Sequence, residues 1–306
     1  MSLHRLLTRL IWTSLVPLVL LGTYLAYDRV VVVRQQQDDA AQALASSVAS
    51  AVEGNMRLRI EVLRTLAESP DLDDPARWGQ FYQLALGYRK VLGADLLLVD
   101  SARQMRLNTR VPWGTPLPAL PVPQGRAAVP LAFATGQPAV GDRFEGPIAG
   151  VPMVALAVPV LRQGQVQQVL LVAEEVAKLQ VRLDARTLPE GWTVSLHDSR
   201  GAVIASKPRL SADAQLPAEG PGRHLLRLPT SGFSVVVQVA PEVREAHVRA
   251  MALALAAAVL AASLVGLLGA HLASRRLGRA LAGLIEAGPP PSAERAITEI
   301  AAVRQT

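Results

Sequence analysis

Two long stretches without charge constrain this chain more than any other feature. Residues 10–27, LIWTSLVPLVLLGTYLAY, and residues 250–270, AMALALAAAVLAASLVGLLGA, contain no acidic or basic side chain. A helix needs about 20 apolar residues to cross the hydrocarbon core of a bilayer, so both are long enough if the first extends slightly. We therefore expect membrane helices over residues 10–31 and 246–272, with the lipid bilayer as a partner of the chain.

Each stretch has one alternative interpretation. The first ten residues, MSLHRLLTRL, supply the basic start of a signal peptide, but no small-x-small cleavage site directly follows the apolar run. This favours a retained anchor. The second stretch could be a buried core helix, but it is apolar on all sides, which is unusual for a domain of this size.

The basic residues beside the two stretches predict the orientation of the chain. Arg5 and Arg9 precede the first stretch, and three arginines follow the second, at positions 275, 276 and 279. Because cations concentrate on the cytoplasmic side of membrane helices, residues 1–9 and 273–306 are expected in the cytoplasm. The intervening sequence then lies outside, and without any cysteine it has to rely on a packed core instead of disulfides.

The formal net charge of the chain is +6, which raises the question of a nucleic-acid partner. The cations are scattered along the sequence and do not gather in one stripe. Solvated faces and membrane orientation account for them, so no nucleic-acid partner is expected.

A long helix is predicted over residues 32–70, directly outside the first span. Alanine, leucine, glutamine, glutamate and arginine dominate this segment, and Pro70 cannot continue it. An apolar series with Asn55 inside it follows heptad-like steps: Leu44, Val48, Ala51, Leu58 and Val62. A seam with one polar member is typical of a parallel helix pair, which predicts a parallel homodimer. The alternative is that this stripe packs against the helix's own domain.

The rest of the outer sequence predicts an α+β fold of two related modules, residues 71–186 and 187–245. The first has a capped helix, a strand–turn–strand unit, a proline- and glycine-rich loop from Val111 to about Pro138, a hairpin and a further helix. The second repeats the scheme in shorter form, because LLLVDSARQMRL and VSLHDSRGAVIA align as strand, Asp, Ser, turn and strand. This order excludes a sandwich or a doubly wound fold.

Two spans flanking a long helix and two such modules resemble the double Cache sensor domain of bacterial receptors, whose modules are PAS-like. The likeness covers most of residues 35–245 and is greatest to the input regions of proteobacterial sensor histidine kinases. The stretches that carry it are NMRLRIEVLRTLAESPDL, GADLLLVDSARQMRLNTRVPWGTPLP, TGQPAVGDRFEGPIAGVPMVALAVPVL and GWTVSLHDSRGAVIA. The resemblance implies a dimeric periplasmic domain of a two-pass protein in the bacterial inner membrane, with a small-molecule pocket in the membrane-distal module.

The segment after the second span resembles part of a HAMP relay. HLASRRLGRALAGLIEAG has leucines in heptad spacing, a Gly-Pro hinge follows, and TEIAAV begins another apolar stripe beside a glutamate. The resemblance implies that the chain passes a signal to a cytoplasmic output domain or kinase. The alternative is an amphipathic tail that lies on the membrane.

The sequence contains no recognisable catalytic motif. The five histidines are never four residues apart, and without cysteine they predict no transition-metal site. There is no G-x-S-x-G, P-loop or G-x-G-x-x-G, no phospho-accepting histidine box and no kinase nucleotide-binding motif. We therefore expect neither enzyme activity in this chain nor a cofactor.

Binding residues are instead expected among the polar and aromatic side chains that interrupt the apolar strands of the first module. Arginine can grip a carboxylate, aspartate can accept from an amine, and tyrosine or tryptophan can form a pocket wall. Alternation along MRLNTR places Met105 and Leu107 on one face and puts Asn108 and Arg110 together on the other. The alternative roles are structural, with Asp142 holding a turn and Trp113 filling the core. The predicted binding residues are Tyr88, Asn108, Arg110, Trp113 and Asp142.

These features predict a membrane-bound sensor input module that binds an unknown small ligand in the periplasm and relays the signal across the membrane. One alternative is the N-terminal portion of a sensor histidine kinase, with catalytic domains beyond this sequence. The other is a membrane-tethered periplasmic scaffold without a signalling role. The mark of a scaffold would be a membrane-distal module filled by its own side chains.

Overall fold

The computed structural model describes residues 3–211, 214–216 and 220–286 of the chain. The chain divides into two compact units, residues 33–246 and a second unit made of residues 1–32 and 247–306. The helix α1 (Leu3–Ala67) continues from the second unit into the first without a break.

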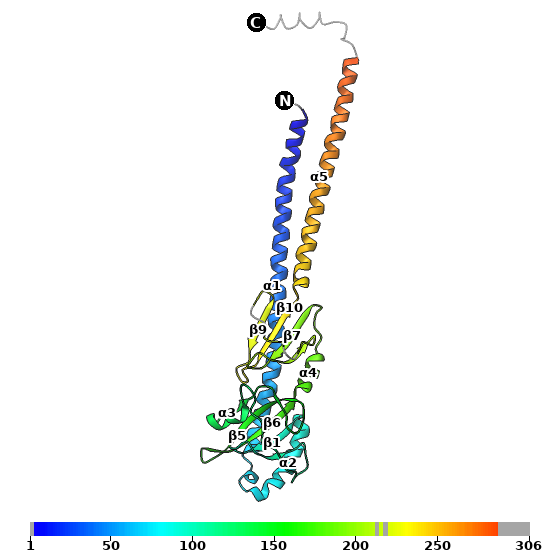
Figure 1. Ribbon diagram of the computed structural model, residues 1–306. Helices are drawn as coiled ribbons and strands as arrows, with labels where there is room; N and C mark the ends of the chain where they lie inside the picture. The colour runs from blue at the N-terminus through cyan, green and yellow to red at the C-terminus, as the bar shows by residue number, and fades with distance from the viewer. Residues whose placement is uncertain (1–2, 212–213, 217–219, 287–306) are drawn as a thin grey trace, which may run out of the picture. The chain divides into compact units, whose positions relative to one another are not determined.

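The unit of residues 33–246 has the predicted α+β fold, with two antiparallel sheets beside α1 (Figure 1). The strands of the larger sheet are β1 (Asp95–Val99), β2 (Met105–Asn108), β3 (Ala139–Val140), β4 (Phe144–Glu145), β5 (Pro152–Arg162) and β6 (Gln165–Glu175). Their order is β2-β1-β6-β5-β3, with β4 paired to β5. Gln163 and Gly164 turn the hairpin between β5 and β6, both with the positive φ that two-residue hairpin turns favour.

The smaller sheet repeats this design, which confirms the predicted duplication. Its strands are β7 (Trp192–His197), β8 (Val203–Lys207), β9 (Arg223–Arg227) and β10 (Ser234–Val239). Their order is β8-β7-β10-β9. The four strands therefore match β2, β1, β6 and β5 of the larger sheet in position and direction.

The turn that follows the first strand of each module shows why the two sequences align. Asp100 Oδ1 accepts a hydrogen bond from Gln104 N at 2.9 Å, and Asp198 Oδ1 accepts one from Ala202 N at 2.9 Å. The residue two positions after each serine has a positive φ, 63° at Arg103 and 85° at Gly201. The aspartate stabilises the same turn in both modules by bonding to its own backbone four residues later.

Each face of the larger sheet packs into a separate apolar cluster. We call the cluster that α1 shares with both sheets the helix-side cluster; Leu63, Leu96 and Val235 are fully buried in it. We call the cluster on the opposite face of the larger sheet the outer cluster, with Leu97, Met105 and Ala173 among its members. Alternation along β1 places Leu96 in one cluster and Leu97 in the other, as the two-residue period of a strand requires.

Five helical segments besides α1 and α5 lie within the described residues, and the first of them is η1 (Pro70–Leu72). The predicted cap at Asp74 is present, because its Oδ1 accepts from Ala76 N at 2.9 Å at the start of η2 (Pro75–Arg77). The helix α2 (Trp78–Leu92) follows it directly, and α4 (Val176–Asp184) leads from the first module to the second. The loop predicted over residues 111–138 contains one more helix, α3 (Ala128–Thr135), where apolar residues cover the outer cluster.

The alternation predicted along MRLNTR is wrong at one position. The register between β1 and β2 shifts, so that Leu98 faces Leu107 but Val99 faces Met105. A residue is thereby added on one strand, which is a β-bulge. Leu107 belongs to the helix-side cluster and Met105 to the outer cluster, so the two do not share a face.

The apolar series predicted as a dimer seam is divided between two environments. Val48 is 4% exposed inside its own chain, and Leu44 and Val62 pack partly against the helix-side cluster. Ala51 and Leu58 are exposed, Leu58 by 62%. The seam as predicted is therefore wrong at Val48, where packing on the helix's own domain, the alternative interpretation, applies.

The second unit contains α5 (Pro241–Glu286) and the first part of α1. Among the residues that the structure describes, one helical stretch, Pro241–Gly269, is long and apolar enough to cross a membrane, judged by length and composition. It includes most of the predicted second span, whereas the first span, residues 10–31, stays a prediction. The relay's first predicted helix is continuous with α5, while its hinge and second helix lie outside the described residues.

Candidate functional site

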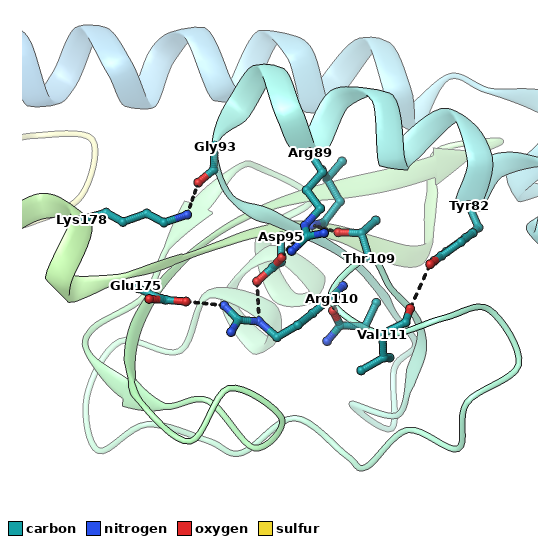
Figure 2. A network of polar contacts seen from close by, with 11 residues as sticks. Tyr82, Arg89, Gly93, Asp95, Thr109, Arg110, Val111, Glu175 and Lys178 are labelled. Atoms are coloured by element: carbon teal, nitrogen blue, oxygen red, sulfur yellow. Dashed lines mark hydrogen bonds and ion pairs between the residues drawn. The ribbon is translucent and has the colours of Figure 1, made fainter.

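Arg110 is the centre of a cluster of charged side chains at one end of the larger sheet (Figure 2). Its Nε donates to Asp95 Oδ2 at 2.7 Å, and its Nη2 donates to Glu175 Oε1 at 2.6 Å. Asp95 also accepts at Oδ1 from Arg89 Nε, at 2.9 Å. Two arginines and two carboxylates therefore form one continuous network, which we call the Arg110 cluster.

Strand alternation explains why these residues meet on one side of the sheet. Asp95 precedes Leu97 by two positions on β1, and Glu175 follows Ala173 by two positions on β6. Leu97 and Ala173 lie in the outer cluster, so both carboxylates extend the row of side chains on that face. Asp95 pairs with Ala173 across the two strands, which brings the ends of both rows together.

Asn108 and the next residue fix the backbone that carries Arg110. Asn108 Oδ1 accepts from the backbone N–H of Arg110 at 2.9 Å, and Thr109 Oγ1 accepts from Leu96 N at 2.9 Å. Asn108 is 6% exposed, and its amide nitrogen lies 3.7 Å from Met105 Sδ in the outer cluster. These bonds fix the backbone after β2 so that the Arg110 side chain extends over β1 to Asp95.

The Arg110 cluster separates an open basin from a small interior void. The basin has a volume of about 300 Å³, and Arg89, Lys90 and Lys178 line it together with the cluster. The void has a volume of about 20 Å³ and lies between Met105, Asn108 and the loop after β4. Asp95 and Arg110 line both spaces.

The electrostatics of the cluster keep Arg110 charged. Burial alone would lower the pKa of Arg110, but the hydrogen bonds and charges of Glu175 and Asp95 outweigh it and raise the pKa above its ordinary value. The arginine is therefore a permanent cation that is held by two carboxylates. Asp95, at 5% exposed, needs such partners to offset its desolvation.

Two of the predicted binding residues, Asn108 and Arg110, come together in this site, and two others lie elsewhere in the first module. Tyr88 packs against the helix-side cluster, on α2. Trp113 is 46% exposed and lies 5.8 Å from the ring of Tyr82, centroid to centroid. Neither aromatic ring lines the void beside Arg110.

Asp142 has a structural role between the two modules. It is 1% exposed and accepts hydrogen bonds from Arg126 N at 2.8 Å, Ser199 N at 3.0 Å and Ser199 Oγ at 2.7 Å. Ser199 belongs to the turn after β7, so the carboxylate joins the loop of the first module to the second module. This corresponds to the alternative in which Asp142 holds a turn.

The sequence interpretation missed Asp95 and Glu175. Asp95 opens an otherwise apolar strand, DLLLV, and an acidic residue at such a position is a signal that a buried partner is required. Glu175 ends an apolar strand in the same way. In the described part of the chain, no group of three or more His, Cys, Asp or Glu residues is placed to hold a metal ion.

The fold described above is similar to that of solved extracellular and ligand-binding domains. The chain is similar to the extracellular domain of rpHK1S-Z16, a candidate histidine kinase, with 16% identity over 68% of this chain and 97% of that one (TM-score 0.53). It is also similar to the ligand-binding domain of Mlp24 with asparagine, at 14% identity over 71% of this chain and 99% of that one (TM-score 0.52).

A third similar structure is the ligand-binding domain of the Pseudomonas fluorescens chemoreceptor CtaA in complex with L-isoleucine. The identity is 13% over 70% of this chain and 97% of that one, with a TM-score of 0.54. No protein-family model matches the sequence. No curated protein is significantly similar to it in sequence. At these identities the likeness concerns the fold.

Proposed function

We propose that residues 33–246 are the ligand-sensing input domain of a two-pass bacterial membrane receptor, and that the Arg110 cluster is its ligand gate. The shared fold with ligand-binding domains of receptors supports the sensing role. The single observation that carries the site is the position of Asp95 and Arg110, which line both the open basin and the interior void.

The chemistry of the cluster favours a small ligand that has both a carboxylate and an amine. Opening the pair between Arg110 and Asp95 leaves a half-buried cation with Glu175 alone and a buried carboxylate with Arg89 alone, so each can take a further partner. An amino-acid-like zwitterion supplies both, with its carboxylate on Arg110 and its amine on Asp95 or Glu175. Asparagine and L-isoleucine are the molecules in two of the similar structures.

The ligand enters this site by displacing side chains. A void of about 20 Å³ has room for about one water and is far too small for an amino acid. The segment from Gly146 to Ala149 forms the outer wall of the void. This segment follows β4 and contains no helix or strand. Occupancy therefore moves this segment outward, and we propose that α4 and α1 transmit the change toward a cytoplasmic output domain or kinase.

The test is Arg110→Lys in the full chain, followed by thermal unfolding with L-amino acids, succinate and putrescine. Lysine keeps one charge beside Asp95 but loses the fork that grips a carboxylate, so the unliganded protein should lose about 1 kcal/mol, or roughly 2–4 °C. In the wild type, a ligand at 100 times its Kd should add about 2.7 kcal/mol. The Lys variant should lose most of that increment.

The matched control is Arg106→Lys. Arg106 is on β2, four residues before Arg110, and pairs with Asp100, but its side chain is 48% exposed and lies outside the site. This variant should keep the full response to the ligand. A ligand response that survives Arg110→Lys, or that disappears equally in both variants, would remove Arg110 from the site.

A second candidate function, the membrane-tethered scaffold, is favoured by the filling of the first module. Its two interior voids have volumes of about 20 Å³ each, since leucine, valine and methionine side chains occupy the outer cluster. A scaffold needs no opening of that cluster. Absence of any stabilising small molecule in the thermal experiment, with an intact fold, would support this function over sensing.

A further inference from the structure

A largely apolar space lies outside the Arg110 cluster. It is a cavity of about 220 Å³ between α1, α4, the helix-side face of the larger sheet and the smaller sheet. All of these elements belong to the unit of residues 33–246. Leu156, Leu196 and Phe233 form part of its floor, and each is buried. Nothing in the proposed sensing site uses this space.

The cavity opens between α1 and α4. Most of its lining is buried, and the residues of the lining that are exposed are Ala51 and Asn55 on α1 and Arg182 on α4. Small side chains on α1, such as Ala51, leave the space unfilled along that helix. A molecule could therefore enter sideways between the two helices without displacing a strand.

One wall of the cavity carries an excess of positive charge. Its lining includes Arg59, Arg182 and Arg186 but a single acidic residue, Glu174. Both oxygens of Glu174 accept from Arg59, at 2.9 and 3.0 Å, and Arg182 Nη2 lies 2.7 Å from Oε2. Arg59 is buried and also donates to Leu92 O at 3.1 Å. Arg59 and Glu174 therefore form a fully hydrogen-bonded buried ion pair. Arg182 and Arg186 lie beside the mouth of the cavity.

Arg182 is suited to bind an anion at the mouth. Its side chain is 47% exposed, so water can be exchanged for a ligand there without removing the group from solvent entirely. A guanidinium has five N–H donors in a planar fork, and the contact with Glu174 engages Nη2. A carboxylate can bind the other edge of the fork while Glu174 keeps its place.

The volume sets the size of the apolar part of the ligand. Protein interiors are close-packed, and voids larger than one water are few. An apolar cavity of about 150 Å³ stays dry and takes up benzene. A cavity of about 220 Å³ therefore accommodates an apolar body of roughly six to eight carbons.

We propose that this cavity is a second ligand site, for a small carboxylate with an apolar body of that size, such as a medium-chain fatty acid or an arylalkanoate. The apolar body fills the space above Phe233 and Leu156, and the carboxylate binds Arg182 at the mouth. The occupant contacts α1, α4 and both sheets at once, so it couples the packing of the two modules to the long helix. It acts independently of the Arg110 cluster.

The test uses the absence of native cysteine in the chain. Ala51→Cys places one thiol at the mouth, and Ala43→Cys places one on the same helix at an exposed position outside the lining. The full chain in lipid nanodiscs is treated with N-ethylmaleimide at increasing concentrations of octanoate. Octanoate should slow labelling of A51C by at least about fivefold and that of A43C by less than twofold, since only the first thiol is covered.

Two further experiments separate the contribution of the ligand's charge to binding from the contribution of its apolar body. Octanamide, which has the same chain without the charge, should protect A51C weakly. In the A51C background, Arg182→Gln should raise the octanoate concentration for half-protection about tenfold, because a charge-assisted contact is lost. Arg110→Lys in the same background should leave protection by octanoate unchanged, which distinguishes this site from the proposed sensing site.

Three outcomes would overturn the proposal. The first is labelling of A51C that octanoate does not slow, and the second is equal slowing of A51C and A43C, which indicates an effect on the bilayer. The third is slow labelling of A51C in the absence of octanoate that speeds up when the nanodiscs hold a single chain, which indicates that a second copy covers the mouth.

Discussion

His197 lies on β7 with no exposed surface, and both of its ring nitrogens have polar partners. Nε2 is 2.8 Å from Ser195 Oγ, and Nδ1 is 3.0 Å from the carbonyl oxygen of Gly201, to which it donates. Burial lowers the pKa of His197 below its ordinary value of 6.5, and the Gly201 carbonyl and the Asp198 charge offset this only in part. The neutral imidazole is therefore the form that the fold requires.

This arrangement predicts that stability falls when the pH drops below about 6.5. Above that pH, His197 is neutral in both the folded and the unfolded protein, so its full contribution to the free energy of unfolding is present. Between 6.5 and the lower pKa of the folded state, only the unfolded chain binds the proton, so stability decreases by up to about 1.36 kcal/mol per pH unit. Thermal unfolding between pH 5 and 7.5 should show this slope for the wild type and a smaller one for His197→Asn. An identical slope in both proteins would show that His197 does not titrate on unfolding.

Asp142 illustrates a carboxylate whose cost of burial is offset by three hydrogen bonds. Two of its donors, the N–H and the hydroxyl of Ser199, come from the second module. Gly125 packs so closely on this carboxylate that an added Cβ would lie 2.2 Å from Oδ2. Removing the carboxylate would leave buried donors unpaired at about 1–3 kcal/mol each, so Asp142 stabilises the junction between the modules.

At the scale of elements, α1 has one buried face and one exposed face. One stripe, including Ala41, Val48 and Leu63, is buried against the helix-side cluster. The face with Leu58 is left exposed, and an exposed leucine on a helix with alanine, serine and glycine around it can pack against a second helix. The dimer seam stays a prediction, and these exposures favour a position near Leu58 over one at Val48.

We therefore expect Leu58→Cys to form a disulfide with a second copy in membranes, and Val48→Cys to do so much less. Leu58 is 62% exposed, whereas Val48 is 4% exposed and cannot reach a partner without unpacking the helix. Arg64→Cys is the control for random collision, because it is exposed on another side of the same helix. Non-reducing gels after mild oxidation provide the yields. Equal yields at positions 58 and 64 would contradict a seam at Leu58.

At the scale of the whole molecule, the flanking cations predict that both termini lie in the cytoplasm. A reporter that is active only in the periplasm should be silent when fused after Thr306, and active when inserted in the β5–β6 turn at Gly164. Gln163 and Gly164 are exposed at the tip of this hairpin, where insertions are best tolerated. Activity of the fusion after Thr306, with a silent insertion at Gly164, would overturn the predicted orientation.

Local patterns in the sequence were sufficient for the elements and their duplication. The Asp-Ser turns at Asp100 and Asp198 and the cap at Asp74 each depend on contacts within four residues of chain. The apolar run over residues 250–270 needs no partner to be recognised. Such features follow from short-range hydrogen bonding and from composition, which a sequence contains in full.

Tertiary structure alone decided which side chains meet. Arg110 pairs with Asp95 and Glu175, which are 15 and 65 residues away along the chain. The bulge between Leu98 and Val99 reversed the face of Met105, and packing of both sheets on α1 placed Val48 inside. Strand register and helix rotation are fixed by burying the apolar surface of distant elements together, so no local period in the sequence determines them.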